Sequence, residues 1–375
     1  MAAAHTDHDI DATAAAMERA LTRPRREGPD MTGGRIEVAL LGLGPMGVII
    51  ARGLLERTDL DFACAADIDP AKVGRDLAEL TGRQARSLTI ADRIGSPRSP
   101  RAGVCIVCTF SSLEQIAPQI LDLVARGWHV VSTCEELSEP WSRPEIARQL
   151  DEAARAAGVA ILGSGINPGY LLDTLPLLLT AACLRVDAVH VRRVVDTNKR
   201  RVPLQRKAGV GLDREVFEGR VRDGQIRHVG LAQSARLLAS GLGWEVETWS
   251  EAVEPVMAQH PVQTGVGDVR PGQTIGLNQS GAATAFGRSV ITYQLQMFAG
   301  APETDEITIE GEPEIHALIA GGLNGDVGTA AVIGNLASLL PRTRPGLLTM
   351  RDAMPLAGFG NRFAGQSGRA TVSSD

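Results

Sequence analysis

A glycine-rich loop between a buried strand and a helix is the feature that most constrains this fold. Residues 36–41 (IEVALL) are apolar almost throughout, as in a strand covered on both faces, and GLGPMG follows directly before an expected helix over 45–57. In a G-x-G-x-x-G loop the first glycine allows a tight turn, the second lets a pyrophosphate approach and the third lets helix and strand pack closely. The loop predicts a dinucleotide site formed by Gly42, Leu43, Gly44, Pro45, Met46 and Gly47.

An acid at the end of the next strand supports this interpretation. The strand expected over 60–67 ends at Asp67, twenty residues after Gly47. A carboxylate there accepts hydrogen bonds from ribose hydroxyls and repels a 2′-phosphate, which favours NAD. Lys72 and Arg75 follow within eight residues and would favour NADP, but they are equally compatible with solvated helix charges. We therefore expect the cofactor to be NAD or NADP, with use of both.

Strand-like and helix-like segments alternate through the first half of the chain. Further strands are expected at 104–109, 129–133 and 159–162, with a weak one near Leu88, and helices from Pro70, over 113–125 and over 144–157. Such alternation predicts an α/β Rossmann domain with a doubly wound parallel sheet, over residues 35–185. Thr109, Phe110 and Ser111, together with Thr133, follow strands at the carboxyl edge, where the nicotinamide end of the cofactor is expected.

The second half of the chain has a different pattern. Longer strand candidates lie at 187–196, 244–253, 273–286 and 291–298, and the last of these alternates with period two. They predict an α+β substrate and dimerisation domain over 186–322 with a mixed, largely antiparallel sheet. An apolar helix over 328–340 is expected to bring residues 323–375 back to the first domain. Residues 1–34 form an N-terminal extension, with a short helix expected around 13–21.

Composition excludes several other classes of protein. The chain has 38 basic and 44 acidic residues, a net charge of −6 and 3% aromatic residues, so nucleic-acid binding is not expected. The apolar run 171–184 is short and contains Asp173 and Pro176, so we expect no membrane span and a cytoplasmic protein. Cys105-x-x-Cys108 has no second pair and no nearby histidine, so we expect reduced thiols and no metal.

Two segments at the carboxyl edge of the sheet carry candidate chemistry. Glu135 and Glu136 follow the strand at 129–133, and desolvation in a cleft would raise a carboxyl pKa towards the range of a general base. The alternative is that these acids complement a helix dipole, and one carboxylate can serve each purpose. Asn167 and Tyr170, in GSGINPGY, are candidates for substrate contact, although a structural turn explains the glycines equally well.

Several segments together resemble a known family. They are GLGPMG with AADIDPAKVGRDL, STCEELSEPW, GSGINPGYLLDT, GVGLDREVFEGRV with HVGLAQS, and GDVGTAAVIGNLASLLPRTRPGLLTM. From Arg35 to about Leu356 the chain resembles the 2,4-diaminopentanoate dehydrogenase and native amine dehydrogenase group, whose first domain is related to dihydrodipicolinate reductases. The reductases' paired histidines are absent from RRVVDTNKRRVPLQRKAGVG, so dihydrodipicolinate reduction is not expected.

The resemblance implies a function and a role for one glutamate. It implies an NAD(P)-dependent amine dehydrogenase that interconverts an amine with a ketone or aldehyde plus ammonia. A glutamate acts on the amine nitrogen, either Glu135 or Glu136, with Glu135 the first choice, and His228 in HVGLAQS is a candidate cleft residue. The alternatives are an oxidoreductase acting on cyclic imines or hydroxy acids on the same scaffold, and a non-catalytic NAD(P)-sensing protein.

The resemblance also implies a homodimer, and the strands of the second domain suggest its interface. We expect a sheet face carrying Ile275, Leu277, Tyr293 and Leu295 to be uncovered in a monomer. An apolar patch of that size would be buried by pairing two such sheets about a two-fold axis.

Overall fold

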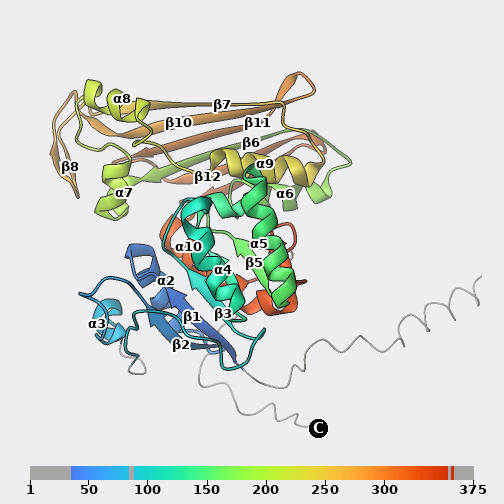
Figure 1. Cartoon of the computed structure of the whole chain (residues 1–375). Coiled ribbons are helices and arrows are strands. Elements are labelled where there is room, and N and C mark those ends of the chain that lie inside the picture. Colours follow the sequence, from blue (N-terminus) through green and yellow to red (C-terminus); the bar gives the residue numbers. More distant parts are fainter. Residues whose placement is uncertain (1–34, 84–87, 354–355, 359–375) are drawn as a thin grey trace, which may run out of the picture. The chain divides into compact units, whose positions relative to one another are not determined.

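A parallel six-stranded sheet forms the first half of the fold in the computed structural model, which describes residues 35–83, 88–353 and 356–358. Its order is β14-β5-β4-β3-β1-β2, and every neighbouring pair is parallel. The strands are β1 (Ile36–Leu41), β2 (Leu60–Ala66), β3 (Val104–Val107), β4 (His129–Ser132), β5 (Ala160–Gly163) and β14 (Gly346–Leu348). The Rossmann-like sheet predicted from the sequence is confirmed (Figure 1), and β14 adds a strand that was not predicted.

Helices cover this sheet and bring the end of the chain back to it. They are α2 (Pro45–Leu55), α4 (Leu113–Ala125), α5 (Pro144–Ala157) and α10 (Gly325–Leu339). Arg57 Nη1 donates to Asn335 Oδ1 at 2.8 Å and Ser338 Oγ donates to Asp59 Oδ2 at 2.6 Å, which fastens α10 beside α2. Val332, Ile333 and Leu336 of α10 share one buried cluster with residues of β1 and α2.

The segment after β2 differs from the prediction. The helix expected from Pro70 is a series of turns, and α3 (Leu77–Thr81) begins only after Asp76, whose side chain accepts the N–H of Ala78. Gly74 has a φ of +84° and its N–H is donated to Ile90 O, so the chain cannot continue as a helix there. The weak strand expected near Leu88 is reduced to isolated bridges of Thr89 and Ala91.

A second six-stranded sheet has the order β13-β12-β6-β11-β10-β7, in which only the central pair β6–β11 is parallel. This confirms the mixed, largely antiparallel sheet. Its strands are β6 (Arg185–Asp196), β7 (Thr248–Met257), β10 (Thr274–Ala285), β11 (Arg288–Phe298), β12 (Thr304–Glu312) and β13 (Ile315–Ala320), and β8 (Val262–Thr264) pairs with β9 (Gly267–Val269) beside it. The associated helices are α6 (Thr174–Leu179), α7 (Val202–Lys207), α8 (Arg214–Arg222) and α9 (Leu231–Leu242).

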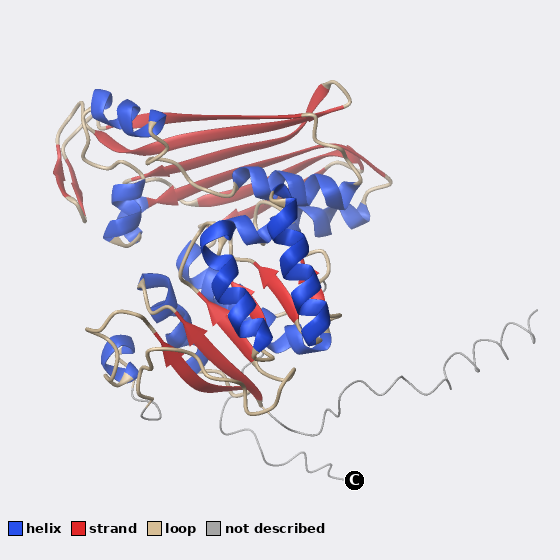
Figure 2. Ribbon diagram, viewed as in Figure 1, coloured by secondary structure: helices blue, strands red, loops and turns tan. Residues whose placement is uncertain are grey.

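The apolar residues of this sheet are not on an uncovered face, so that expectation was wrong. Helices α6 and α9 lie along one face of the sheet (Figure 2), and Leu277, Tyr293 and Leu295 are 1–2% exposed in the core on that face. Tyr293 even donates its hydroxyl to Leu172 O at 2.7 Å, and Ile275 packs against the same cluster. The prediction failed because alternation shows which residues share a face, not which face the helices cover.

Two expectations concern other parts of the chain. The helix expected around 13–21 lies outside the described residues. In the described part of the chain, no helix has the length and apolar character needed to cross a bilayer.

Candidate active site

The glycine loop has the geometry that dinucleotide binding requires. Gly42 has a φ of +95°, and a Cβ on Gly47 would lie 1.9 Å from Gly42 O, so these two glycines are needed by the turn and by helix packing. A Cβ on Gly44 would meet no protein atom within 4 Å. The backbone at Gly44 therefore leaves open space at the first turn of α2, where a pyrophosphate can approach the N–H groups.

Asp67 connects the end of β2 to this loop. Its Oδ2 accepts the N–H of Leu43 at 2.7 Å and Lys72 Nζ at 3.1 Å, and its Oδ1 accepts the N–H of Asp69 at 2.9 Å. Burial raises the pKa of Asp67, but these hydrogen bonds outweigh it and lower the pKa overall. Lys72 is thus held by Asp67, while Arg75 pairs with Glu79 at 2.7 Å in an exposed position.

Two adjoining hollows, together called the cleft, open beyond the carboxyl ends of β1, β3, β4 and β5. One measures about 270 Å³ and is lined by the residues after these strands, among them Thr109, Phe110, Ser111, Thr133 and Ser164. The other measures about 230 Å³ and reaches the second sheet at Leu277 and Met297. Both are lined by Met46, Glu135, Asn167, Arg201, Lys207 and Thr329.

The two adjacent glutamates have different surroundings. Glu135 begins the 3₁₀ turn Glu135–Ser138 and lines both hollows, and no described donor hydrogen-bonds its carboxylate. Glu136 does not line the cleft: its Oε2 accepts the N–H of Leu113 at 2.8 Å, at the first turn of α4. Glu136 therefore stabilises a helix N-terminus, and Glu135 presents a free carboxylate to the cleft.

The loop carrying Asn167 is held by a buried acid. Asp173 Oδ2 accepts the N–H of Gly169 at 2.8 Å and Ser234 Oγ at 2.7 Å, which ties the loop to α9. In the amide orientation that satisfies both its groups, Asn167 accepts Arg193 Nη1 at 3.1 Å. Asn167 lines the cleft, whereas Tyr170 packs against the core of the first sheet and does not line either hollow.

His228 contributes a neutral imidazole to the cleft. Burial, which is the largest cause, and the charges of Lys207, Arg193 and Arg200 together lower its pKa to about 3. Its Nδ1 is buried without a hydrogen-bond partner in the described part of the protein, and the Oγ of Ser164, which lines the other hollow, is likewise unpaired. Unpaired buried polar atoms are costly unless a ligand or water satisfies them, so both atoms indicate that the cleft binds a polar ligand.

The cations of the cleft were not predicted from the sequence. Arg200 and Arg201 both pair with Asp326 of α10, at 3.0 and 3.1 Å. Lys207 of α7 and Arg227, before α9, line the cleft, and no acidic side chain in the described ranges pairs with either. These residues lie in the second half of the chain, and no local pattern signals that they meet the carboxyl edge of the first sheet.

The residues present fit a nicotinamide dinucleotide. The open space at Gly44 suits the pyrophosphate, Asp67 suits the ribose, and Thr109, Phe110, Ser111 and Thr133 line the hollow where the nicotinamide end belongs. The fold and this site define an NAD(P)-dependent oxidoreductase.

Comparison with known proteins identifies the family. The model of the 2,4-diaminopentanoate dehydrogenase C-terminal domain matches residues 170–363, just over half of the chain. The 2,4-diaminopentanoate dehydrogenase of Acetoanaerobium sticklandii is 27% identical over 85% of this chain and 93% of that protein, and the amine dehydrogenase of Streptomyces virginiae is 24% identical over 84% and 96%. The chain belongs to the 2,4-diaminopentanoate dehydrogenase family, which confirms the resemblance seen in the sequence.

A solved structure supports the same fold. The amine dehydrogenase from Mycobacterium smegmatis superposes with a TM-score of 0.74 at 22% identity, covering 88% of this chain and 98% of that one. The likeness therefore extends over both sheets.

Proposed function

We propose that this protein is an amine dehydrogenase that catalyses reversible oxidative deamination. A protonated amine, oxidised NAD(P) and water give a ketone or aldehyde, ammonium, reduced NAD(P) and a proton. The family supports an oxidation at a carbon that bears nitrogen. The nicotinamide supplies the hydride acceptor when it is bound.

Glu135 is the residue that acts on the amine. In the oxidative direction its carboxylate takes the proton of the substrate ammonium and releases it to solvent, so that the nitrogen lone pair can assist hydride departure. It then takes a proton from the attacking water and returns it to the leaving nitrogen. Its negative charge also stabilises the cationic iminium between these two steps. The observation that carries this assignment is the free carboxylate of Glu135 in both hollows, beside Glu136 that is already used by α4.

His228 and Asn167 are proposed as substrate contacts. A histidine that stays neutral can donate or accept a hydrogen bond without repelling the substrate ammonium, and its Nδ1 has no described protein partner. Asn167 is oriented by Arg193 and reaches the same cleft. Both would position the substrate rather than transfer its proton.

Paired glutamine variants test the assignment. Glu135→Gln keeps the shape of the side chain and removes the base, so we expect turnover to fall by about 10²- to 10⁴-fold with the NADH dissociation constant unchanged. Glu136→Gln is the matched control and should keep most of the turnover. Full activity in Glu135→Gln would refute the role of this residue.

The cations of the cleft favour a substrate with an anionic group. The hollow that reaches the second sheet has an excess of positive charge. Its lining has four cations, Arg200, Arg201, Lys207 and Arg227, and two acids, Glu135 and Asp326. An ammonium substrate alone would be repelled by such a lining. We propose that Lys207 and Arg227 bind a carboxylate group of the amine substrate. The relative from Acetoanaerobium sticklandii is named for 2,4-diaminopentanoate, an amine that carries such a carboxylate.

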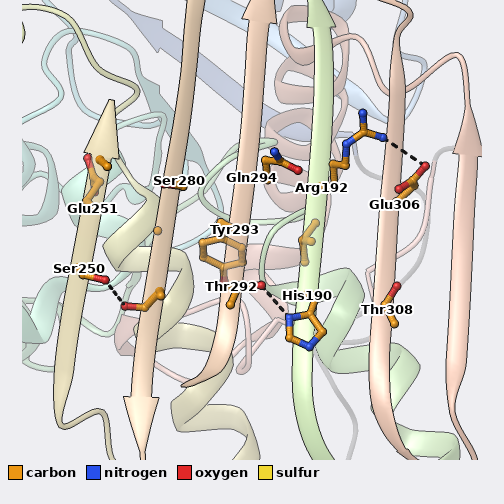
Figure 3. A pocket seen from close by; sticks show the side chains of 14 residues that line it. His190, Arg192, Ser250, Glu251, Ser280, Thr292, Tyr293, Gln294, Glu306 and Thr308 are labelled. Carbon is orange, nitrogen blue, oxygen red and sulfur yellow. Dashed lines mark hydrogen bonds and ion pairs between the residues drawn. The ribbon is translucent and has the colours of Figure 1, made fainter. Parts of the chain in front are cut away.

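We also propose a homodimer, through the face of the second sheet opposite α6 and α9. This face carries polar side chains and a hollow of about 450 Å³ (Figure 3). Arg192 of β6 pairs with Glu306 of β12 at 3.5 Å, and His190 pairs with Glu310 at 3.0 Å. On the other side of β6, Thr292 and Gln294 of β11 and Ser280 of β10 are half-buried or exposed. Charges of both signs on one flat face suit a second copy turned about a two-fold axis, which can pair each charge with its opposite.

A further inference from the structure

A second cationic hollow lies outside the cleft. It measures about 600 Å³ and is lined by residues of α7 and α8, by the β8–β9 hairpin and by the loop after it. Arg206 comes from α7, Arg220 from α8 and Arg270 from that loop, and the only acid of the lining is Asp268. Three separate segments thus each contribute an arginine to the lining of one hollow.

These three guanidinium groups lack partners in the described structure. No carboxylate oxygen of the described residues lies within the 4.0 Å limit of an ion pair from any of them, and none of them donates a side-chain hydrogen bond to a described residue. Arg214, at the start of the same helix as Arg220, is by contrast paired with Glu218 at 3.3 Å. All three arginines are exposed, and like charges along one hollow repel each other, so a lining of this kind favours a bound anion.

The chemistry of the lining indicates which anion fits. Guanidinium groups donate two parallel hydrogen bonds to phosphate oxygens, and several around one hollow match a polyanion better than a single carboxylate. The remaining walls include Val210, Leu212, Val266 and Val269, which give an apolar surface for the rest of a ligand. We propose that this hollow is a binding site for a phosphorylated small molecule, separate from the active site.

The position of the hollow relates it to the cleft. Helix α7 separates the two, because Arg206 lines the hollow while Lys207 lines the cleft. No residue lines both, so a ligand in the hollow does not compete directly with substrate or cofactor.

Calorimetric titration of the full chain with inorganic pyrophosphate, at saturating NADH, tests the proposal. We expect one saturable site, with binding weakened by about tenfold or more in both Arg220→Gln and Arg270→Gln, since each removes a bidentate phosphate contact. Arg222→Gln is the matched control: it removes the same charge from the same helix but does not line the hollow. Its affinity should stay within about twofold of the unmodified protein.

Three outcomes would overturn the proposal. The first is no saturable binding at millimolar pyrophosphate, and the second is an equal loss in Arg222→Gln, which would mean unspecific charge attraction. The third is loss of binding in Lys207→Gln with Arg220→Gln unaffected, which would place the anion in the cleft. Thermal unfolding of each variant shows whether it folds, and either hollow variant alone is sufficient for the comparison.

Discussion

Gly44 and Gly47 lie three residues apart in one loop and are glycines for different reasons. A Cβ at Gly47 would collide with Gly42 O, whereas a Cβ at Gly44 would enter open space. The φ and ψ of Gly44, −65° and −177°, are also accessible to alanine. Only a ligand, and no part of the described protein, requires a glycine at position 44.

Gly44→Ala is therefore expected to fold normally and to lose cofactor. The melting temperature should stay within about 2 °C of the unmodified protein, while the NADH dissociation constant rises by about tenfold or more. Gly53→Ala, where a Cβ also meets nothing within 4 Å, is the control and should bind NADH normally. Fluorescence titration measures the NADH dissociation constant of the two variants. Unchanged NADH binding in Gly44→Ala would place the pyrophosphate elsewhere.

Substitution of Lys207 tests whether the substrate carries a carboxylate that this residue binds. We expect Lys207→Gln to raise KM for an amine bearing a carboxylate by about tenfold, the loss of one charged hydrogen bond, and to leave KM for the analogue without the carboxylate unchanged. Lys199→Gln, an exposed lysine paired with Glu303, serves as control. Equal effects on both substrates would contradict a carboxylate contact.

The residues of the cleft differ in how far sequence could predict them. Glu135 and Asn167 follow strands of the first sheet, so their place at the carboxyl edge follows from the pattern. The proposed choice of Glu135 over Glu136 rests on the hydrogen bond that Glu136 accepts from the N–H of Leu113, because both acids occupy one turn. Lys207 and Arg227 are contributed by the second half of the chain, and no spacing rule connects them to that edge.

At the scale of elements, strands were predicted better than connections. Apolar runs marked β1 to β5, and alternation marked β11, since each pattern reflects burial along the strand itself. The turns after β2 depend on Gly74 bonding to Ile90, sixteen residues away, and β14 is only three residues long. The covered face of the second sheet depends on α6 and α9, which strand periodicity does not describe.

Substitution of Ser234 in α9 tests how the loop that carries Asn167 is held in place. Burial raises the pKa of Asp173, and the hydrogen bond from Ser234 is the largest of those that oppose it. Ser234→Ala would leave this buried carboxyl with one donor fewer, so we expect the free energy of unfolding to fall by about 1.5–3 kcal/mol. Ser240→Ala, at an exposed position of the same helix, should cost less than about 1 kcal/mol.

Urea denaturation of the two variants measures the difference. Equal stability of Ser234→Ala and Ser240→Ala would show that Asp173 does not depend on α9. The loop of Asn167 would then be held by its own turn alone.

At the scale of the whole molecule, the polar face of the second sheet predicts the assembly. Sedimentation should give twice the chain mass of 39.7 kDa. Gln294→Lys places an extra cation beside Arg192, opposite it in the sheet, and should produce monomers, while Gln225→Lys, off this face, should not. A monomer at micromolar concentration without any substitution would contradict the dimer.

The cleft brings the cofactor loop of the first sheet together with cations and a histidine from the second half of the chain. We propose that the reaction in this cleft uses ammonia. The most direct test is oxidation of NADH or NADPH with a carbonyl substrate, measured with and without ammonium. We expect that oxidation requires ammonium, that an amine accumulates in equal amount, and that both stop in Glu135→Gln. Oxidation at the same rate in ammonia-free buffer would contradict it and would indicate reduction of a carbonyl or cyclic imine instead.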